Sequence, residues 1–115
     1  VVFDAVIDNA DRKGGHVLLE GDRIRLVDHG VSFAEEPKLR TVAWQFAGEE
    51  VDPELRADAA RLAEALARDE PATRVLDRLL TGPEQRRLHD RAVAVAAWRV
   101  YPEPRGPRPY PWPLV

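Results

Sequence analysis

Cysteine is absent from this sequence of 115 residues, so disulfide bonds and thiolate metal sites are excluded. A chain without cysteine suits a reducing compartment, and we expect a cytoplasmic protein. Long hydrophobic runs are also missing, because no stretch approaches the ~18 apolar residues of a transmembrane helix, and no signal-peptide pattern occurs. We therefore predict no transmembrane segment.

Positive charge is not in excess either. The sequence has 17 Lys and Arg against 20 Asp and Glu, which gives a formal net charge of −3. Proteins that bind nucleic acid by neutralising phosphates are usually basic, so we expect no nucleic acid partner. What the chain does contain, 44% hydrophobic and 32% charged residues, is typical of one globular domain.

A predicted β-hairpin organises the first third of the chain. Residues 17–20 are apolar and β-compatible, and Gly21-Asp22 forms the turn. Arg23 to Val27 alternates charged with apolar residues, as a half-buried strand does.

A two-residue turn sets the register of this hairpin, with the pairs Glu20 with Arg23, Val17 with Leu26, and His16 with Val27. Asp28 then lies opposite Gly15. The polar runs 9–16 and 28–30 are therefore expected to meet at the open end of the hairpin, which suggests a site.

The residues brought together are of the kinds that phosphoryl transfer uses. Such a site needs carboxylates for Mg²⁺, an acceptor for the proton of the substrate hydroxyl, and cations for phosphate oxygens. Asp11, Arg12 and Lys13 are the catalytic candidates, and Asp28 is a candidate metal ligand. An Asp, a metal ligand five residues later, a short hairpin and then Asp-x-Gly is the order of a kinase catalytic loop and its metal-binding loop. Here the second position is His16.

The run NADRKGGH followed by DHG resembles the catalytic half of the phosphatidylinositol 3/4-kinase-like superfamily, especially the type II phosphatidylinositol 4-kinases and a group of actinobacterial relatives. The YPWPLV ending is similar to those actinobacterial proteins. The similarity spans nearly the whole chain, although only the two loops are specific. It implies a kinase that uses ATP with Mg²⁺, or with Mn²⁺.

By this resemblance, Asp11 takes the place of the catalytic aspartate that accepts the hydroxyl proton, and Asp28 that of the metal-binding aspartate. The metal-binding asparagine of the family falls at His16. A neutral imidazole is a poorer partner for hard Mg²⁺ than an amide oxygen. Asn9, two residues before Asp11, is the candidate to substitute for it.

Simpler interpretations of the same residues stay open. Asp11 taken alone would be a helix-ending residue that caps a turn, and Asp28 would start a tight turn before Gly30. His16 and His29 would be zinc ligands together with these aspartates, but the spacing matches no compact zinc pattern.

Val1 to Ala10 reads as a helix, because apolar residues recur at three- and four-residue spacing while Asp4 and Asp8 fall on the other face. Two glycines, Gly14 and Gly15, are expected to stop it. The pattern opens without an N-cap, which indicates a fragment of a longer protein.

Residues 29–51 have weak periodicity and resemble an activation segment, where kinases of this kind recognise substrate. Lys38 and Arg40 are its candidate substrate-binding cations, either for an acidic headgroup or, as the favoured alternative, for pairing with nearby glutamates, Glu35 and Glu36. Two aromatic residues of this segment are expected in the core, Trp44 and Phe46.

Three helices are predicted after residue 51, as support rather than chemistry. Asp52 caps the first, which begins at Pro53 and stops near Asp69. The second covers 72–80, and the third covers 81–99 with a Thr81–Glu84 capping box. Their predicted buried residues are Leu55, Ala59, Leu62 and Leu66, then Val75, Leu76 and Leu79, then Leu88, Ala92, Val95 and Ala96.

Six of the ten prolines lie between Tyr101 and Val115, interleaved with aromatic residues. Such a sequence is incompatible with a helix or a central strand and is typical of an extended, polyproline-like arm. The arm either docks on its own domain, which we favour, or binds a proline-reading partner.

The predicted fold class is α+β, a mostly helical protein-kinase-like C-terminal lobe with a small hairpin. The lobe covers 1–100, and the arm covers 101–115. Within the lobe we expect a catalytic loop at 9–16, a hairpin at 16–27, a metal loop at 28–30, an activation-segment-like loop at 29–51 and helices at 53–99.

The predicted function is transfer of phosphate from ATP to an alcohol group of a lipid, a protein or a small molecule. A kinase also needs a phosphate-covering loop and a lysine from an N-terminal lobe, for which there is no room before Asp11. That missing lobe is the implied partner, and the fragment alone is expected to be inactive. Two alternatives stay open: a non-catalytic, pseudokinase-like binding module and a metal-dependent phosphohydrolase.

Overall fold

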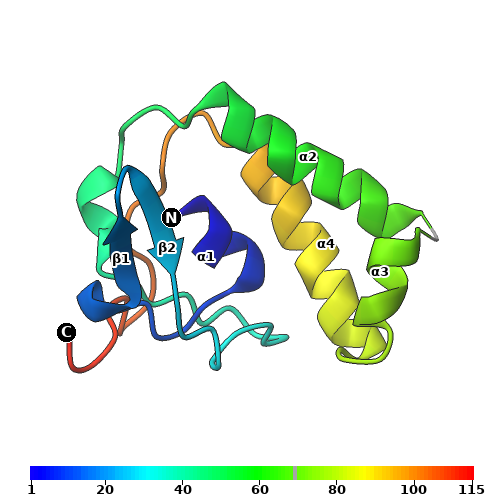
Figure 1. The fold of residues 1–115 in the computed structure, drawn as a ribbon, viewed down its shortest axis with the longest axis horizontal. Helices are drawn as coiled ribbons and strands as arrows, with labels where there is room; N and C mark the ends of the chain where they lie inside the picture. The colour runs from blue at the N-terminus through cyan, green and yellow to red at the C-terminus, as the bar shows by residue number, and fades with distance from the viewer. Residues whose placement is uncertain (69) are drawn as a thin grey trace.

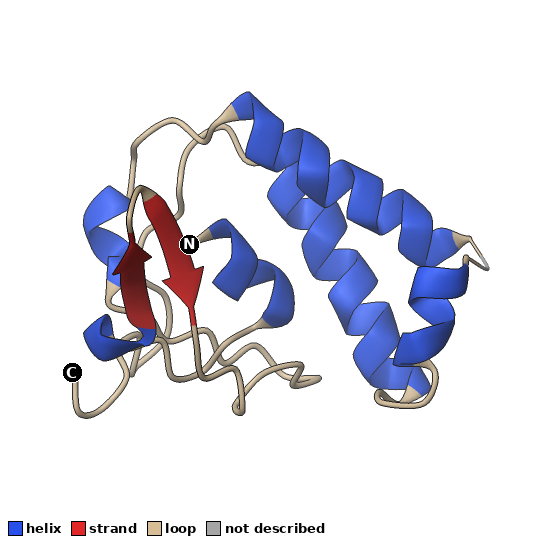
Figure 2. Ribbon diagram, in the orientation of Figure 1, coloured by secondary structure: helices blue, strands red, loops and turns tan. Residues whose placement is uncertain are grey.

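The computed structural model of the protein describes residues 1–68 and 70–115. These residues form helices and one small antiparallel hairpin, so the predicted α+β class is confirmed (Figure 2). In chain order the elements are α1 (Val2–Ile7), the 3₁₀ turn η1 (Gly14–His16), β1 (Val17–Glu20), β2 (Arg23–Leu26), the 3₁₀ turn η2 (Ala43–Phe46), α2 (Pro53–Ala67), α3 (Pro71–Leu76) and α4 (Gly82–Ala96).

Helix α1 is shorter than the predicted 1–10. It ends at Ile7, and Asp8 caps it in the left-handed region with φ 54°. The two glycines that were expected to stop the helix begin η1 instead. The prediction that Asp4 and Asp8 face outward is wrong, because they are only 2% and 3% exposed. The two carboxylates are buried because polar groups from later segments bind them: the Arg12 guanidinium binds Asp4, and the Lys38 amide binds Asp8. Helical periodicity alone does not reveal such partners.

The predicted hairpin is confirmed in detail. Val17 pairs with Leu26 and Glu20 with Arg23. The Val27 amide donates to the His16 carbonyl at 3.0 Å, which extends the ladder by one step. Gly21 starts the turn with φ 62°, a conformation that glycine adopts without a steric penalty.

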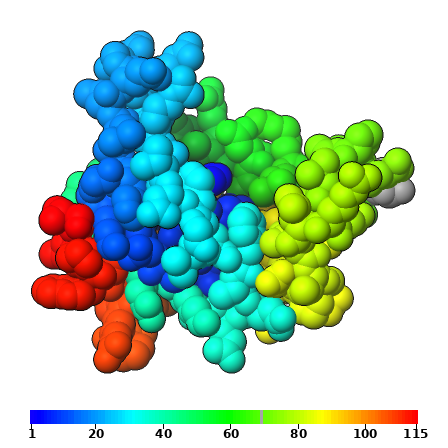
Figure 3. All heavy atoms as spheres, turned by 60° about the horizontal axis from the view of Figure 1, so that its bottom comes forward, coloured from blue at the N-terminus to red at the C-terminus, as the bar shows by residue number. Residues whose placement is uncertain are grey.

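The prediction of a half-buried second strand is wrong, because the hairpin projects from the body (Figure 3). Leu19 and Ile24, which face each other across the ladder, are 76% and 68% exposed. Within the described residues no second layer packs on either strand closely enough to bury it.

Helices α2 and α4 pack along each other, and α1 lies against α4 (Figure 1). The core residues predicted on α4 are confirmed, since Leu88, Ala92 and Val95 are at most 3% exposed. Both predicted caps are confirmed as well: Asp52 accepts the Glu54 amide, and Thr81 forms a capping box with the residue three positions on.

The helix ends differ from the predictions by a few residues. Helix α4 stops at Ala96 rather than at residue 99, and α2 stops at Ala67. The end predicted near Asp69 falls on a residue outside the described part of the chain. On α2, Ala59 is buried as predicted, but Leu55, in the first turn of the helix, is 38% exposed, so its predicted burial is wrong.

Helix α3 is only six residues long, against the predicted 72–80. Leu76 packs against the core, whereas Val75 and Leu79 are 56% and 70% exposed, so their predicted burial is wrong. Because the helix ends at Leu76, Leu79 no longer continues its apolar stripe.

The C-terminal arm docks on its own domain, as we favoured from the sequence. The Pro109 carbonyl accepts the Thr41 amide at 3.1 Å and the Trp44 indole Nε1–H at 2.7 Å, and the Leu114 carbonyl accepts the Gly14 amide at 3.0 Å. Trp44 is buried as predicted, but Phe46 is 39% exposed. No helix among the described residues is long and apolar enough to cross a membrane.

Candidate functional site

The predicted site is built around Arg12, whose side chain is only 1% exposed. Its guanidinium binds the Asp4 carboxylate, with Nη2 2.8 Å from Oδ1 and Nε 3.0 Å from both oxygens. Nη1 donates to the Val27 carbonyl at 2.7 Å, and Nη2 lies 3.0 Å from Nδ1 of His29. Arg12 therefore ties α1 to the base of the hairpin.

This arrangement positions the two polar loops but leaves Arg12 without an open face. A buried, bidentate Arg–carboxylate pair with further carbonyl acceptors is a structural contact. The direct catalytic role predicted for Arg12 does not fit this placement, because its donors already have internal partners.

The hairpin register brings the two polar loops together, as the sequence predicted, and His16 contacts Asp28 there. His16 Nε2 lies 3.4 Å from Asp28 Oδ2. His16 Nδ1 accepts the Lys13 amide at 3.4 Å, so a neutral ring carries its proton on Nε2 and points it at Asp28. Asp28 remains 60% exposed, and its backbone is left-handed with φ 58°.

Asp11 and Lys13 form an ion pair on the other loop. Lys13 Nζ lies 3.0 Å from Asp11 Oδ2, and their side chains are 20% and 30% exposed respectively. The Asp11 amide donates to Asn9 Oδ1 at 2.9 Å, which fixes the backbone next to the carboxylate. Asp11 therefore has a held backbone and a partly accessible side chain.

Asn9 does not fit the role of a metal ligand. Its side chain is fully buried, its Oδ1 accepts the Asp11 amide, and its Nδ2 donates to Asp4 at 3.3 Å. Both ends of the amide are thus used to hold the loop. Of the three predicted metal ligands, Asn9, His16 and Asp28, the structure brings only the last two into contact.

The side chains at this site could hold Mg²⁺ only through one protein carboxylate, with the other oxygen ligands supplied by water and substrate. Magnesium commonly binds one or two carboxylates together with waters and substrate phosphates, and Asp28 meets that requirement. Across residues 1–68 and 70–115, no three His, Asp or Glu side chains cluster as a ready metal site.

The segment that holds the two substrate-binding candidates runs beside the predicted catalytic loop, because the Arg40 amide donates to the Asn9 carbonyl and the Arg40 carbonyl accepts the Arg12 amide, each at 3.0 Å. Lys38 and Arg40 line a cavity formed with α4 and the arm. In the described chain neither side chain pairs with a glutamate, so the favoured pairing with Glu35 and Glu36 is not observed. The Lys38 backbone amide binds the buried Asp8 carboxylate at 3.0 Å.

Sequence reasoning missed three cations that line this cavity, Arg91, Arg105 and Arg108. Arg91 was assigned to a supporting helix, and the two others lie in the proline-rich arm. The arm's two arginines were the available signal, but only the docked arm brings them to the cavity that Lys38 and Arg40 also line.

The chain is similar to Protein Rv2133c of Mycobacterium tuberculosis. The two sequences are 42% identical over 113 residues, a match that covers 97% of this chain and 40% of that protein. The chain thus spans less than half the length of that relative. No protein-family model and no solved structure matches the chain.

Proposed function

We propose that the chain carries the base and metal-ligand half of an ATP-dependent phosphotransferase of the phosphatidylinositol 3/4-kinase-like type. The supporting observation is the convergence of two loops on Arg12. Its backbone follows Asp11, and its side chain binds the carbonyl of Val27, directly before Asp28. Two accessible aspartates from distant parts of the sequence are thereby held on one rigid framework.

The proposed roles follow from this placement. The oxygen of a substrate hydroxyl attacks the γ-phosphorus of ATP, the new O–P bond forms as the bond to the ADP oxygen breaks, and the hydroxyl proton passes to Asp11. Lys13, next to Asp11, supplies positive charge for the transferred phosphate. When bound, Mg²⁺ would be held by Asp28 and would neutralise charge on the phosphate oxygens.

His16 and Arg12 act as positioning residues in this proposal. His16 points its Nε2 proton at Asp28, and Arg12 holds the backbone before Asp28 through the Val27 carbonyl. We place the groups that bind the adenine and phosphates of ATP outside these 115 residues, in keeping with the greater length of Protein Rv2133c.

The decisive experiment measures transfer of γ-phosphate by the full-length chain, with Mg²⁺ and with Mn²⁺. We expect Asp11→Asn and Asp28→Asn each to lower the rate by about 10²-fold or more, because each removes a group used in the transfer step. Asp22→Asn, in the exposed turn of the same hairpin, is the matched control and should leave the rate unchanged. Turnover that survives Asp11→Asn would refute the proposed base.

A non-catalytic binding module is the second candidate, favoured by the buried Asn9, which leaves His16 where a kinase places an amide ligand. The two candidates separate in a Mn²⁺ titration of the chain followed by NMR line broadening. Broadening around residues 27–30 that Asp28→Asn abolishes supports phosphotransfer. Nucleotide binding by the full-length chain without turnover and without this broadening supports the module.

A further inference from the structure

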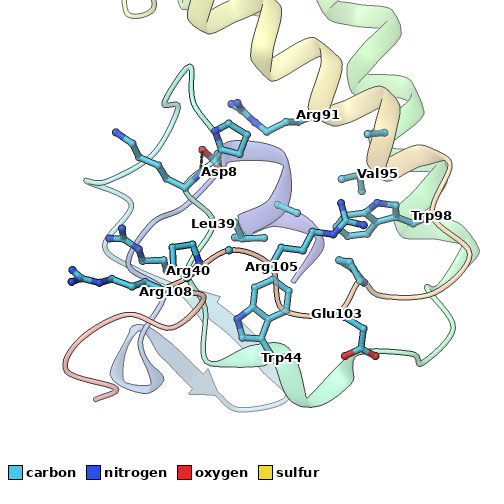
Figure 4. A pocket seen from close by; sticks show the side chains of 17 residues that line it. Asp8, Leu39, Arg40, Trp44, Arg91, Val95, Trp98, Glu103, Arg105 and Arg108 are labelled. Carbon is cyan, nitrogen blue, oxygen red and sulfur yellow. Dashed lines mark hydrogen bonds between the residues drawn. The ribbon is translucent and has the colours of Figure 1, made fainter.

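A cavity of about 540 Å³ lies between residues 37–40, helix α4 and the arm residues 102–108 (Figure 4). Its apolar lining includes Leu39 of the 37–40 segment, Val95 of α4 and Trp98, which follows that helix. Pockets that bind small organic ligands commonly measure about 300–1,000 Å³ and are mostly apolar. This cavity therefore has the volume and the apolar lining that are typical of a small-molecule site; we call the apolar part around Leu39, Val95 and Trp98 its floor.

The rim of the cavity is strongly cationic. Five basic residues line it, and they come from three separate parts of the chain: Lys38, Arg40, Arg91, Arg105 and Arg108. The hydrogen bond between the Thr41 amide and the Pro109 carbonyl places the 40–41 and 108–109 segments side by side. Accordingly, Arg40 and Arg108 extend in the same direction in Figure 4.

The two acidic residues that line the cavity offset only part of the charge of the five basic ones. Asp8 is only 3% exposed, and its carboxylate already accepts the Lys38 amide at 3.0 and 3.1 Å. Glu103 directs its carboxylate away from the labelled arginines (Figure 4). A net positive rim therefore remains in an overall acidic protein of net charge −3.

The cations themselves are not used to hold the fold together, with one exception. Within the described residues, the side chains of Lys38, Arg40, Arg105 and Arg108 make no ion pair and no hydrogen bond. Arg91 is the exception, because its Nε donates to the Val6 carbonyl at 2.7 Å and its Nη1 to the Ala34 carbonyl at 3.1 Å.

Arg91 nevertheless has donor capacity to spare. Its Nη2 is buried and has no hydrogen-bond partner among the described residues, whereas most buried donors in proteins are satisfied. Burial lowers the pKa of Arg91 below its ordinary value, and Asp8 opposes that shift. Clustered like charges of this kind repel one another, and a bound anion relieves that repulsion.

We infer that this cavity binds a small organic phosphate, with an apolar ring on the floor beside Trp98 and the phosphate on the cationic rim. Phosphate is the anion that fits, since it carries up to two negative charges and its oxygens match the guanidinium fork. A single carboxylate would leave most of the rim uncompensated. The inference does not rest on the proposed phosphotransfer, because Asp11, His16 and Asp28 are not among the described residues that line the cavity.

The test is isothermal titration calorimetry of the 115-residue chain with phenyl phosphate, benzoate, phenol and inorganic phosphate. We expect one phenyl phosphate per chain, bound at least tenfold more tightly than each of the other three. Arg105→Gln with Arg108→Gln should weaken this binding at least tenfold. Lys38→Gln, in the 37–40 segment that lines the cavity, should weaken it several-fold.

The matched control is Arg23→Gln with Arg25→Gln, which removes the same charge from the exposed hairpin and should leave phenyl phosphate binding unchanged. Circular dichroism verifies that each variant is folded, and Lys38→Gln keeps the test decisive if the arm variant unfolds. Asp28→Asn should bind phenyl phosphate normally even if it destroys phosphotransfer, so failure of one proposal is distinguishable from failure of the other.

Several results would overturn the inference. They are an absence of phenyl phosphate binding at millimolar concentration, equal binding of benzoate or of inorganic phosphate, and equal weakening in the hairpin control. Vesicles of phosphatidylcholine with one tenth phosphatidic acid form a separate arm. Retention of the chain on these vesicles without binding of phenyl phosphate would point to a membrane surface and would contradict a small-molecule site.

Discussion

The buried pair of Asp4 and Arg12 offers the sharpest test of how this fold is held together. The two side chains are 3% and 1% exposed, and three nitrogen–oxygen contacts of 2.8 to 3.0 Å join them. Asp4→Asn keeps the shape of the side chain and one acceptor oxygen but removes the negative charge. It leaves the Arg12 guanidinium buried without its counter-charge.

Removing one partner of a buried ion pair typically costs about 3–5 kcal/mol of unfolding free energy. Asp4→Asn should lie near the lower end of that range and Asp4→Ala near the upper end, because the asparagine oxygen still accepts a hydrogen bond. A domain of this size has about 5–15 kcal/mol in total, so either loss is a large fraction of the stability.

Urea unfolding at neutral pH, followed by tryptophan fluorescence and far-UV circular dichroism, measures this loss. With a slope of about 1–3 kcal/mol per M, a loss of 3 kcal/mol lowers the midpoint by about 1–3 M. Glu20→Gln is the control, since it breaks an exposed pair with Arg25 whose side chains are 58% and 68% exposed, and it should cost about 0–1 kcal/mol. A loss below about 1 kcal/mol for Asp4→Asn would refute the reasoning.

Two further predictions concern the packing of the arm and of the helices. Trp44→Phe should lower the free energy of unfolding in urea by about 1–2 kcal/mol, because it removes the hydrogen bond to Pro109 and part of a buried ring. The control is Trp112→Phe, at an 87% exposed position, which should change stability by less than about 0.5 kcal/mol. Equal effects of the two substitutions would mean that the arm is not anchored at Trp44. Leu88→Ala should cost about 2–5 kcal/mol and lower the calorimetric Tm, because Leu88 is 3% exposed between the helices, and Val93→Ala on the exposed face of α4 is its control. An unchanged Tm for Leu88→Ala would contradict the assigned core.

Features of the candidate site were predictable where the contacts that cause them lie close together in the sequence, and unpredictable where they do not. The meeting of the two polar loops that contain His16 and Asp28 was predictable, because a two-residue turn sets the register and places both loops at the open end of the hairpin. The burial of Arg12 was not predictable, since its partner Asp4 lies on a different element, eight residues earlier. The burial of Asn9 was not predictable for the same reason, because its side-chain amide binds Asp4 and the Asp11 backbone and is not free for a ligand.

The cationic cavity was visible in the sequence only as two residues, Lys38 and Arg40. The other cations lie more than fifty residues further along the chain, on α4 and in the arm. Nothing local to Arg105 or Arg108 indicates which surface the arm reaches. The position of the arm depends on the hydrogen bonds that the Pro109 carbonyl accepts from the Thr41 amide and the Trp44 indole.

By itself, the sequence determined the elements whose cause lies within a few residues. These are the hairpin and its register, the Asp52 cap, the Thr81 capping box and the α4 face of Leu88, Ala92 and Val95. Turn chemistry, capping and periodicity act over one to four residues, so they can be read from the chain directly.

Only the tertiary structure decided which charged groups are buried and which are left on a surface. Asp4, Asp8 and Arg12 are buried because partners from other segments compensate them, while the side chains of Lys38, Arg105 and Arg108 are left around a cavity without partners among residues 1–68 and 70–115. Residue type alone leaves the outcome open, because the cost of burying a charge depends on the groups that the fold places around it.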